Sequence, residues 1–212
     1  TAKEFGVMRF VYSSSSSVYG NHPTLPLVET MFPRPLSPYA LQKYTSEEYC
    51  RLFHMLYGLE TVSLRYFTVY GPRQNPDGAY AGQSPKFFSK LLKGEVPVIN
   101  GDGTQTRDNT YVDDVVEANV LAGCQTPSKK VSDTLFGQAF NIGGGQNTSV
   151  NDTTRLILKF TKSSIKPTHG PAVIEPKDTL ADTSKAKAIL GWEPKTSYED
   201  GLTATYEYFK NR

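Results

Sequence analysis

A tyrosine and a lysine four residues apart, Tyr39 and Lys43, follow a run of five serines, Ser13–Ser17. On a helix, residues at positions i and i+4 project from the same face. A phenol, whose ordinary pKa is about 10, is a poor base at neutral pH, but an ammonium beside it stabilises the phenolate and lowers that pKa. A nearby serine hydroxyl can share the transferred proton. The pattern therefore indicates proton-transfer chemistry with a tyrosine as the base.

The residues around this pattern decide between a site and a coincidence. The same spacing arises by chance on many amphipathic helices, and a serine run is also typical of a flexible loop. However, Ser37 and Pro38 form a strong helix start, with Ser37 as the N-cap and Pro38 at the first helical position. Val7–Tyr12 has the composition of a buried strand, so the serines follow a strand end. We interpret Ser13–Lys43 as one functional unit.

The order of the expected elements predicts an α/β fold with a parallel sheet. A helix begins at Pro38 and ends at Gly58, and the β-branched and aromatic stretch Thr61–Thr68 follows as a strand. Strand, helix and strand in this order favour a right-handed parallel crossover. Ligands of such sheets bind beyond the carboxyl ends of the strands. Ser13–Ser17 and Tyr66–Tyr70 both lie at such ends.

The remainder of the chain continues with short alternating elements. Gly143–Gly145 lacks the lysine of a P-loop and the spacing of a dinucleotide fingerprint, so we interpret it as a turn and not as a phosphate loop. The elements that we expect after Gly71 are helices at about 84–92, 111–123, 152–160, 183–190 and 198–210, and short strands at 96–99, 139–142 and 172–175.

Composition excludes several classes of protein. The 212 residues are 38% hydrophobic and 21% charged with a net charge of +2, and no basic cluster indicates a nucleic-acid partner. Cys50, Cys124 and the three histidines lack the spacing of metal ligands, so we expect no metal. No signal peptide or membrane-spanning pattern is visible. We expect a cytoplasmic protein without a membrane partner.

The ordered motifs resemble the extended short-chain dehydrogenase/reductase family, specifically its NAD-dependent nucleotide-sugar epimerases such as UDP-glucose and UDP-N-acetylglucosamine 4-epimerases. The matching stretches occur in the order of the family and cover nearly the whole chain: SSSSSVYG, SPYALQKYTSE, LRYFTVYGPRQNPDGAY, INGDGTQTRDNTYVDDV, FNIGGG and LADTSKAKAILGWEPKTSYEDGL. The family begins with a glycine-rich fingerprint that is absent here. We therefore expect that an N-terminal half is missing.

The resemblance implies a division of the chain. Residues 1–71 would be the remaining part of a Rossmann-like NAD-binding domain and would carry the catalytic residues. Residues 72–212 would mainly form a smaller α/β domain that binds the nucleotide sugar, with about 104–142 returning to the Rossmann-like sheet.

The resemblance also implies roles for individual residues. Tyr39 would take the proton of the sugar 4-hydroxyl while NAD accepts the hydride, and Lys43 would stabilise the phenolate and bind the nicotinamide ribose. Arg107 would contact a substrate phosphate, and Val98 and Asn100 would hold the uracil. In full, the implied site residues are Ser15, Tyr39 and Lys43 for catalysis, Ser13, Ser14, Tyr39, Lys43, Tyr66 and Phe67 for the cofactor, and Ser16, Ser17, Thr68, Val98, Asn100 and Arg107 for the substrate.

Departures from the family pattern leave the substrate open. The serine motif lacks the acidic residues of related dehydratases and decarboxylases, which favours C4 epimerisation of UDP-glucose and UDP-galactose or their N-acetyl forms. Thr68 stands where most relatives have asparagine and resembles UDP-glucuronate epimerases, whereas Asn75–Tyr80 resembles enzymes that act on UDP-N-acetylhexosamines. Before Leu180, the usual arginine is absent and Lys177 is its possible replacement.

Two further alternatives for the function remain open. The chain could belong to another NAD-dependent sugar-nucleotide oxidoreductase, or it could be a non-catalytic fragment or binding module.

Relatives commonly form homodimers through the helix that carries the tyrosine and lysine. Here the apolar face of that helix, formed by Tyr44, Tyr49, Leu52 and Phe53, is the expected dimer surface, although intrachain packing would explain it equally well.

Overall fold

The centre of the fold is a three-stranded parallel sheet. The computed structural model describes residues 2–78, 81–125 and 135–212. In this sheet the order is β1-β2-β6, where the strands are β1 (Arg9–Ser15), β2 (Glu60–Tyr66) and β6 (Gln138–Ile142). Ser15 pairs with Tyr66, and Tyr66 pairs with Ile142, so the carboxyl ends of all three strands are level. The α/β class with a parallel sheet is confirmed.

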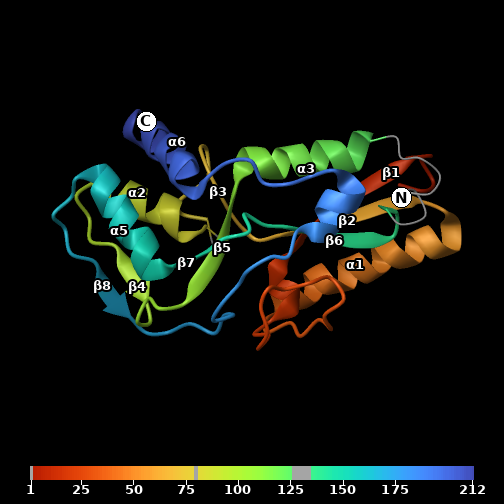
Figure 1. Cartoon of the computed structure of the whole chain (residues 1–212), viewed down its shortest axis with the longest axis horizontal. Coiled ribbons are helices and arrows are strands. Elements are labelled where there is room, and N and C mark those ends of the chain that lie inside the picture. Colours follow the sequence, from red (N-terminus) through yellow and green to blue (C-terminus); the bar gives the residue numbers. More distant parts are fainter. Residues whose placement is uncertain (1, 79–80, 126–134) are drawn as a thin grey trace.

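Two helices cover the two faces of this sheet, with α1 (Pro38–Tyr57) on one side and α3 (Val112–Cys124) on the other (Figure 1). The start of α1 has the predicted cap, because the Ser37 hydroxyl accepts a hydrogen bond from the Ala40 N–H at 3.2 Å and Pro38 opens the first turn. The helix ends at Gly58, whose φ of 68° is left-handed. Local cap residues therefore fix both ends of the helix that carries Tyr39 and Lys43.

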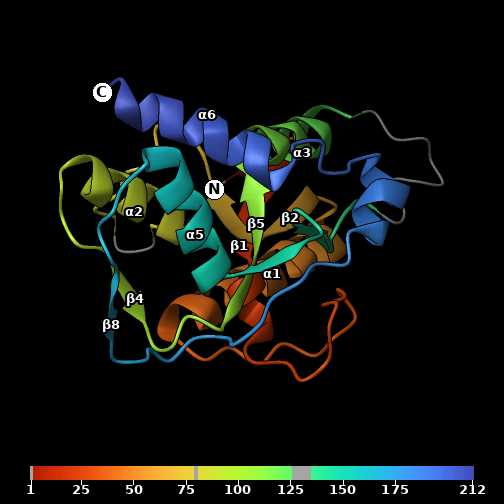
Figure 2. The same ribbon diagram turned by 60° about the vertical axis from the view of Figure 1, so that its left-hand side comes forward.

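The second part of the molecule combines short strands with three helices. β5 (Thr106–Tyr111) lies between β3 (Thr68–Tyr70), to which it is parallel, and β7 (Asn147–Ser149), to which it is antiparallel. Figure 2 shows β5 between α5 and the central sheet. The helices α2 (Gln83–Leu92), α5 (Val150–Thr161) and α6 (Tyr198–Lys210) enclose an apolar core that includes Phe88, Ile157, Leu202 and Phe209.

One expected strand is wrong and another element differs from the expectation. β4 (Val98–Asn100) pairs in parallel with β8 (Thr168–Gly170), and residues 172–175 form no strand. The β-branched residues of that stretch lie between Pro171 and Pro176, and Ile174 is 89% exposed instead of packing in a sheet. The helix expected at 183–190 closes with the π-helical turn η2 (Ala186–Leu190). Within the described ranges, no helix combines the length and the apolar character that a membrane span requires.

Candidate active site

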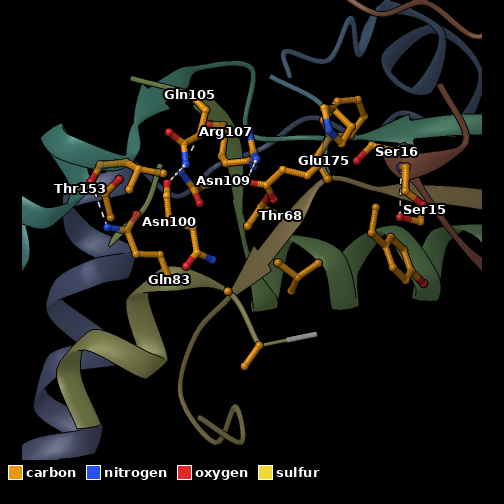
Figure 3. A pocket seen from close by; sticks show the side chains of 18 of the residues that line it. Ser15, Ser16, Thr68, Gln83, Asn100, Gln105, Arg107, Asn109, Thr153 and Glu175 are labelled. Carbon is orange, nitrogen blue, oxygen red and sulfur yellow. Dashed lines mark hydrogen bonds and ion pairs between the residues drawn. The ribbon is translucent and has the colours of Figure 1, made fainter. Parts of the chain in front are cut away.

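A cavity of about 720 Å³ opens beyond the carboxyl ends of β1 and β2, and we call it the strand-end cavity. Its wall joins the central sheet and α1 to residues of β3, β4, β5, α2 and α5. Figure 3 shows Ser15 and Ser16 at one end of the cavity, Gln83 and Asn100 at the other, and Arg107 and Glu175 between them. The volume is within the ordinary range for a small-molecule site.

The serine run forms a strand end followed by a tight turn. Ser15 ends β1, and its hydroxyl accepts a hydrogen bond from the Ser17 N–H at 3.2 Å as the N-cap of the 3₁₀ helix η1 (Ser16–Tyr19). Gly20 ends this turn with a φ of 64°, and a Cβ there would lie 1.9 Å from the carbonyl oxygen of Arg34. Only glycine fits at this position, and the turn directs Ser15, Ser16 and Ser17 into the cavity wall.

Tyr39 and Lys43 lie at the same corner as the serines. Tyr39 is half-buried and lines the cavity. The Lys43 ammonium donates a hydrogen bond to the carbonyl oxygen of Ser13 at 2.6 Å and lies 5.6 Å from the centroid of the Tyr39 ring. Neither Lys43 nor Ser13 is part of the cavity wall, so the lysine reaches the corner from beside it. The structure thus brings Ser15, Tyr39 and Lys43 into one region.

Ser14, Tyr66 and Phe67, which were expected to contact the cofactor, differ in their hydrogen-bond partners and burial. The Ser14 hydroxyl donates a hydrogen bond to Glu47 on the α1 side of the sheet. The Tyr66 hydroxyl instead shares a hydrogen bond of 3.1 Å with the Ser13 hydroxyl and donates one to the Asn119 amide oxygen at 2.8 Å. Sequence reasoning missed Asn119, whose only signal was a polar residue within an apolar helix. Phe67 is buried and contributes to the cavity wall.

Arg107 lies midway along the cavity and is bonded to other parts of the chain. Its guanidinium pairs with a Glu175 oxygen at 2.8 Å and donates to the carbonyl oxygens of Thr106 at 2.7 Å and Lys177 at 3.0 Å. Lys177 therefore meets Arg107 through its backbone. Sequence reasoning did not identify Glu175, because the contact joins residues far apart in the chain. Arg107 retains donors that a phosphate or carboxylate can use in place of Glu175.

The far end of the cavity is rich in amide and hydroxyl groups. Gln83 donates to the Thr154 hydroxyl at 2.7 Å and to the Val150 carbonyl at 2.9 Å. Gln105 donates to the carbonyl oxygen of Asn100 at 2.8 Å. Val98 and Asn100, the residues expected to hold the uracil, line this end, and Thr68 lies between it and the serines (Figure 3). Such groups offer both donors and acceptors to a heterocyclic ligand.

Two polar atoms indicate that the cavity suits a polar ligand. The Ser17 hydroxyl and the Gln74 amide oxygen are buried without a hydrogen-bond partner among the described residues, and both residues line the cavity. Buried polar atoms in proteins almost always have partners. A ligand or water with donors and acceptors would supply them here.

The glycine run beside the site is a turn, as the sequence predicted. The N–H groups of Gly144 and Gly145 donate to the Asp108 carboxylate at 2.6 and 3.2 Å, and Ala181 N–H donates to it at 2.9 Å. These N–H groups are therefore occupied and do not form a phosphate loop. Burial raises the pKa of Asp108 to about 6, although the three hydrogen bonds act in the opposite direction.

The sequence and the fold place the chain in a known family. Residues 1–143 match the NAD dependent epimerase/dehydratase family, and the chain belongs to this family. It is 38% identical to a putative UDP-glucose 4-epimerase of Methanocaldococcus jannaschii over 215 residues, which covers 99% of this chain and 65% of the relative. A UDP-glucuronate 4-epimerase of Thermodesulfobacterium geofontis is also 38% identical, over 98% of this chain and 61% of its own length.

Solved structures of the same family have the same fold. The UDP-glucose 4-epimerase of Thermotoga maritima, solved with UDP-glucose, has a TM-score of 0.90 and 40% identity over 99% of this chain and 66% of its own. The UDP-glucuronic acid 4-epimerase of Bacillus cereus, solved with UDP-glucuronic acid and NAD, has a TM-score of 0.86 and 39% identity over 96% of this chain and 62% of its own. The chain thus spans somewhat less than two thirds of the length of these relatives.

Proposed function

We propose that the protein containing this chain is an NAD-dependent 4-epimerase of UDP-sugars, with UDP-glucose and UDP-galactose or their N-acetyl forms as substrates. One observation carries the proposal: Ser15 and Tyr39 line one end of the strand-end cavity with Lys43 beside Tyr39, and Arg107 and an amide-rich recess line the rest of it. This arrangement matches a ligand with a reacting sugar, an anionic middle and a heterocyclic base.

The proposed mechanism assigns proton transfer to this corner. The Tyr39 phenolate takes the proton of the sugar 4-hydroxyl, and the Ser15 hydroxyl shares that proton. The Lys43 ammonium stabilises the phenolate by its charge, and its bond to the Ser13 carbonyl keeps it beside the tyrosine ring. When the 4-keto sugar has turned in the cavity, Tyr39 returns the proton from its own side of the site.

The chain's residues fit the nicotinamide end of NAD. When bound, NAD accepts a hydride from the sugar and returns it. The Lys43 ammonium has three donors, of which one goes to Ser13, and it can offer another to a ribose hydroxyl. Ser13, Ser14, Tyr66 and Phe67 lie at the strand ends, where α/β sheets bind dinucleotides. We assign residues 1–71 to this function and residues 72–212 mainly to the sugar nucleotide.

A specific observation favours UDP-glucuronate as a second candidate substrate. Thr68 lines the cavity between the serines and Arg107, close to where the sugar would lie. A threonine hydroxyl can donate a hydrogen bond to a uronate carboxylate. Two of the similar proteins described above are UDP-glucuronate 4-epimerases.

The test is activity of the full-length protein on UDP-glucose, UDP-N-acetylglucosamine and UDP-glucuronate. Replacing Tyr39 with phenylalanine removes the proton acceptor, so we expect kcat to fall by about 100- to 10,000-fold with little change in stability. Tyr57→Phe at the far end of the same helix, where the side chain is 50% exposed, is the matched control and should keep full activity. Full activity of Tyr39→Phe would exclude the mechanism, and inactivity of the wild type on all three substrates would exclude the function.

Dimerisation belongs to the same proposal. α1 exposes apolar side chains to solvent, including Leu41 at 53%, Tyr49 at 61% and Leu56 at 61%, which suits contact with a second copy. Of the residues expected at the dimer surface, Tyr44, Leu52 and Phe53 are half-buried within the chain. Light scattering of the full-length protein measures the oligomeric state, and a monomer would exclude the pairing. The cytoplasmic location stays a prediction.

A further inference from the structure

A third residue of α1 lies on the same helix face as Tyr39 and Lys43. Glu47 follows Lys43 by four residues, as Lys43 follows Tyr39, so the three side chains form one row along α1. Lys43 bonds to the backbone of Ser13, and Glu47 accepts a hydrogen bond from the hydroxyl of Ser14. α1 is therefore attached to β1 at two consecutive residues, immediately before Ser15.

Glu47 is buried and paired with Arg65 of β2. The side chain of Glu47 is 5% exposed and that of Arg65 is 6% exposed. Arg65 Nε donates to Glu47 Oε1 at 3.0 Å, and Nη2 donates to Oε2 at 2.7 Å. This two-pronged contact fixes the direction of the carboxylate as well as its distance. The helix is thus held in a defined place along both β1 and β2.

The remaining arm of Arg65 extends the contact to the serine turn. Arg65 Nη1 donates to the Tyr19 hydroxyl at 2.9 Å, and that hydroxyl donates to the Asn141 amide oxygen at 2.6 Å. Asn141 in turn donates from its amide to the Leu27 carbonyl at 2.8 Å. One continuous set of bonds therefore joins α1, β1, β2, β6 and the turn that follows Ser15.

These bonds are a poor way to gain stability. Removing two charges from water costs free energy that their attraction only partly returns, and apolar pairs of similar size often stabilise a protein as well or better. The directional bonds instead specify one relative position of the helix and the strands. The pair lies between α1 and β2, with Arg65 one residue before Tyr66, which lines the strand-end cavity.

We propose that Glu47 and Arg65 are positioning residues that hold α1 in register with β1, so that Tyr39 and Lys43 keep their place relative to Ser15. Neither residue lines the cavity, so both act through the groups that do. This inference rests on the proposed function, because holding Tyr39 and Lys43 in place matters for the reaction that is assigned to Tyr39.

The test replaces the pair with apolar residues of similar volume, as Glu47→Leu/Arg65→Met, in the full-length protein. We expect kcat to fall by about 10- to 100-fold, because small displacements of reacting groups have effects of this size. KM for the sugar nucleotide should change less than twofold, because the residues around Arg107 are untouched. Hydrogen exchange of residues 38–46 should become faster even where the denaturation midpoint is unchanged.

The matched control is Arg9→Met/Glu60→Leu. This ion pair joins the same two strands at their amino ends, with Arg9 Nε and Glu60 Oε2 at 2.9 Å, far from the cavity. We expect kcat to remain within about twofold of the wild type. If the first double variant is too unstable to assay, Glu47→Gln keeps the side-chain size and an acceptor for Ser14, and a smaller fall in kcat is expected.

The outcomes separate the two proposals. A Glu47→Leu/Arg65→Met protein with normal kcat and normal exchange in residues 38–46 would overturn the positioning role. An equal fall of kcat in the control would attribute the effect to general loss of stability and would also overturn it. An inactive wild type would overturn the proposed function alone, because hydrogen exchange of α1 still tests the positioning role.

Discussion

The two faces of the central sheet differ in chemistry although both are buried. Toward α3, β2 presents Val62 and Leu64, which pack with Phe140, Ile142 and Trp192 in an apolar core. Toward α1, the same strand presents polar side chains, and all of them are at most 5% exposed: Thr61, Ser63 and Arg65. Strands of parallel sheets usually carry apolar residues on both faces.

This difference separates two tasks. Apolar packing supplies free energy but tolerates changes of shape, so a core of the right volume folds with many side-chain combinations. Hydrogen bonds are directional and lose their value when the partners shift. The face toward α3 therefore stabilises the sheet, and the face toward α1 sets where the helix lies. The site lies at the end of the second face.

The largest effect on stability should come from the apolar face. Phe140 is fully buried in the core between the sheet and α3, so Phe140→Ala should lower the free energy of unfolding by about 3–5 kcal/mol. Urea denaturation measures this loss, and kcat per folded molecule should stay near the wild-type value. A large fall in kcat at full folding would show that both faces position the site, and the contrast between them would fail.

Asp108 of β5 is a buried polar group outside the central sheet, and it gives a pH-dependent prediction for comparison with the two faces. Asp108 is fully buried, and its pKa is raised from 3.8 to about 6. The folded state therefore binds the proton more tightly, and this stabilisation is complete below pH 3.8 and disappears as the pH rises through 6. Between these limits the wild type should lose about 3 kcal/mol relative to Asp108→Asn.

Thermal unfolding of both proteins across this pH range measures the difference. The stability of Asp108→Asn should show no such loss across this range, because the amide carries no proton that titrates there. Parallel pH curves for the two proteins would show that Asp108 does not titrate in this range.

The smallest effect is expected where water reaches an ion pair. Glu175 is 39% exposed and pairs with Arg107 inside the cavity. Such pairs contribute less than about 1 kcal/mol, so Glu175→Gln should free Arg107 for a substrate phosphate and lower KM by about two- to fivefold. Steady-state kinetics with Lys187→Gln, at an exposed pair away from the cavity, provides the control. A higher KM would instead indicate that Glu175 itself contacts the substrate.

Local signals in the sequence predicted much of the fold. Ser37, Pro38 and Gly58 determine the ends of α1 through contacts within a few residues, and the strand before the serines follows from its composition. The strand predicted at 172–175 was wrong because β-branched content indicates a strand only where a partner strand is available. Strand pairing of this kind depends on the whole fold and is invisible in a local window.

The same distinction between local signals and long-range contacts applies to the predicted site. The positions of Ser15 and Tyr39 along the cavity follow from a strand end and a helix start, which are local properties, whereas Arg107 was expected there only from the resemblance to the family. Glu175 beside Arg107 and Arg65 beside Glu47 join distant parts of the chain, and neither pairing could be read from spacing. Charged residues at such positions look like ordinary surface residues until the elements are packed.

The bond between the Tyr19 hydroxyl and Asn141 has a consequence for the order of assembly. These residues are 122 positions apart in the sequence, so the Tyr19 hydroxyl lacks this acceptor until β6 has joined the sheet. Contacts between distant residues form only after a long loop has closed. The hydrogen bonds around the turn that follows Ser15 are therefore completed when β6 joins the sheet. A growing chain that ends before residue 141 contains Ser15, Tyr39 and Lys43 but lacks the bond between Tyr19 and Asn141.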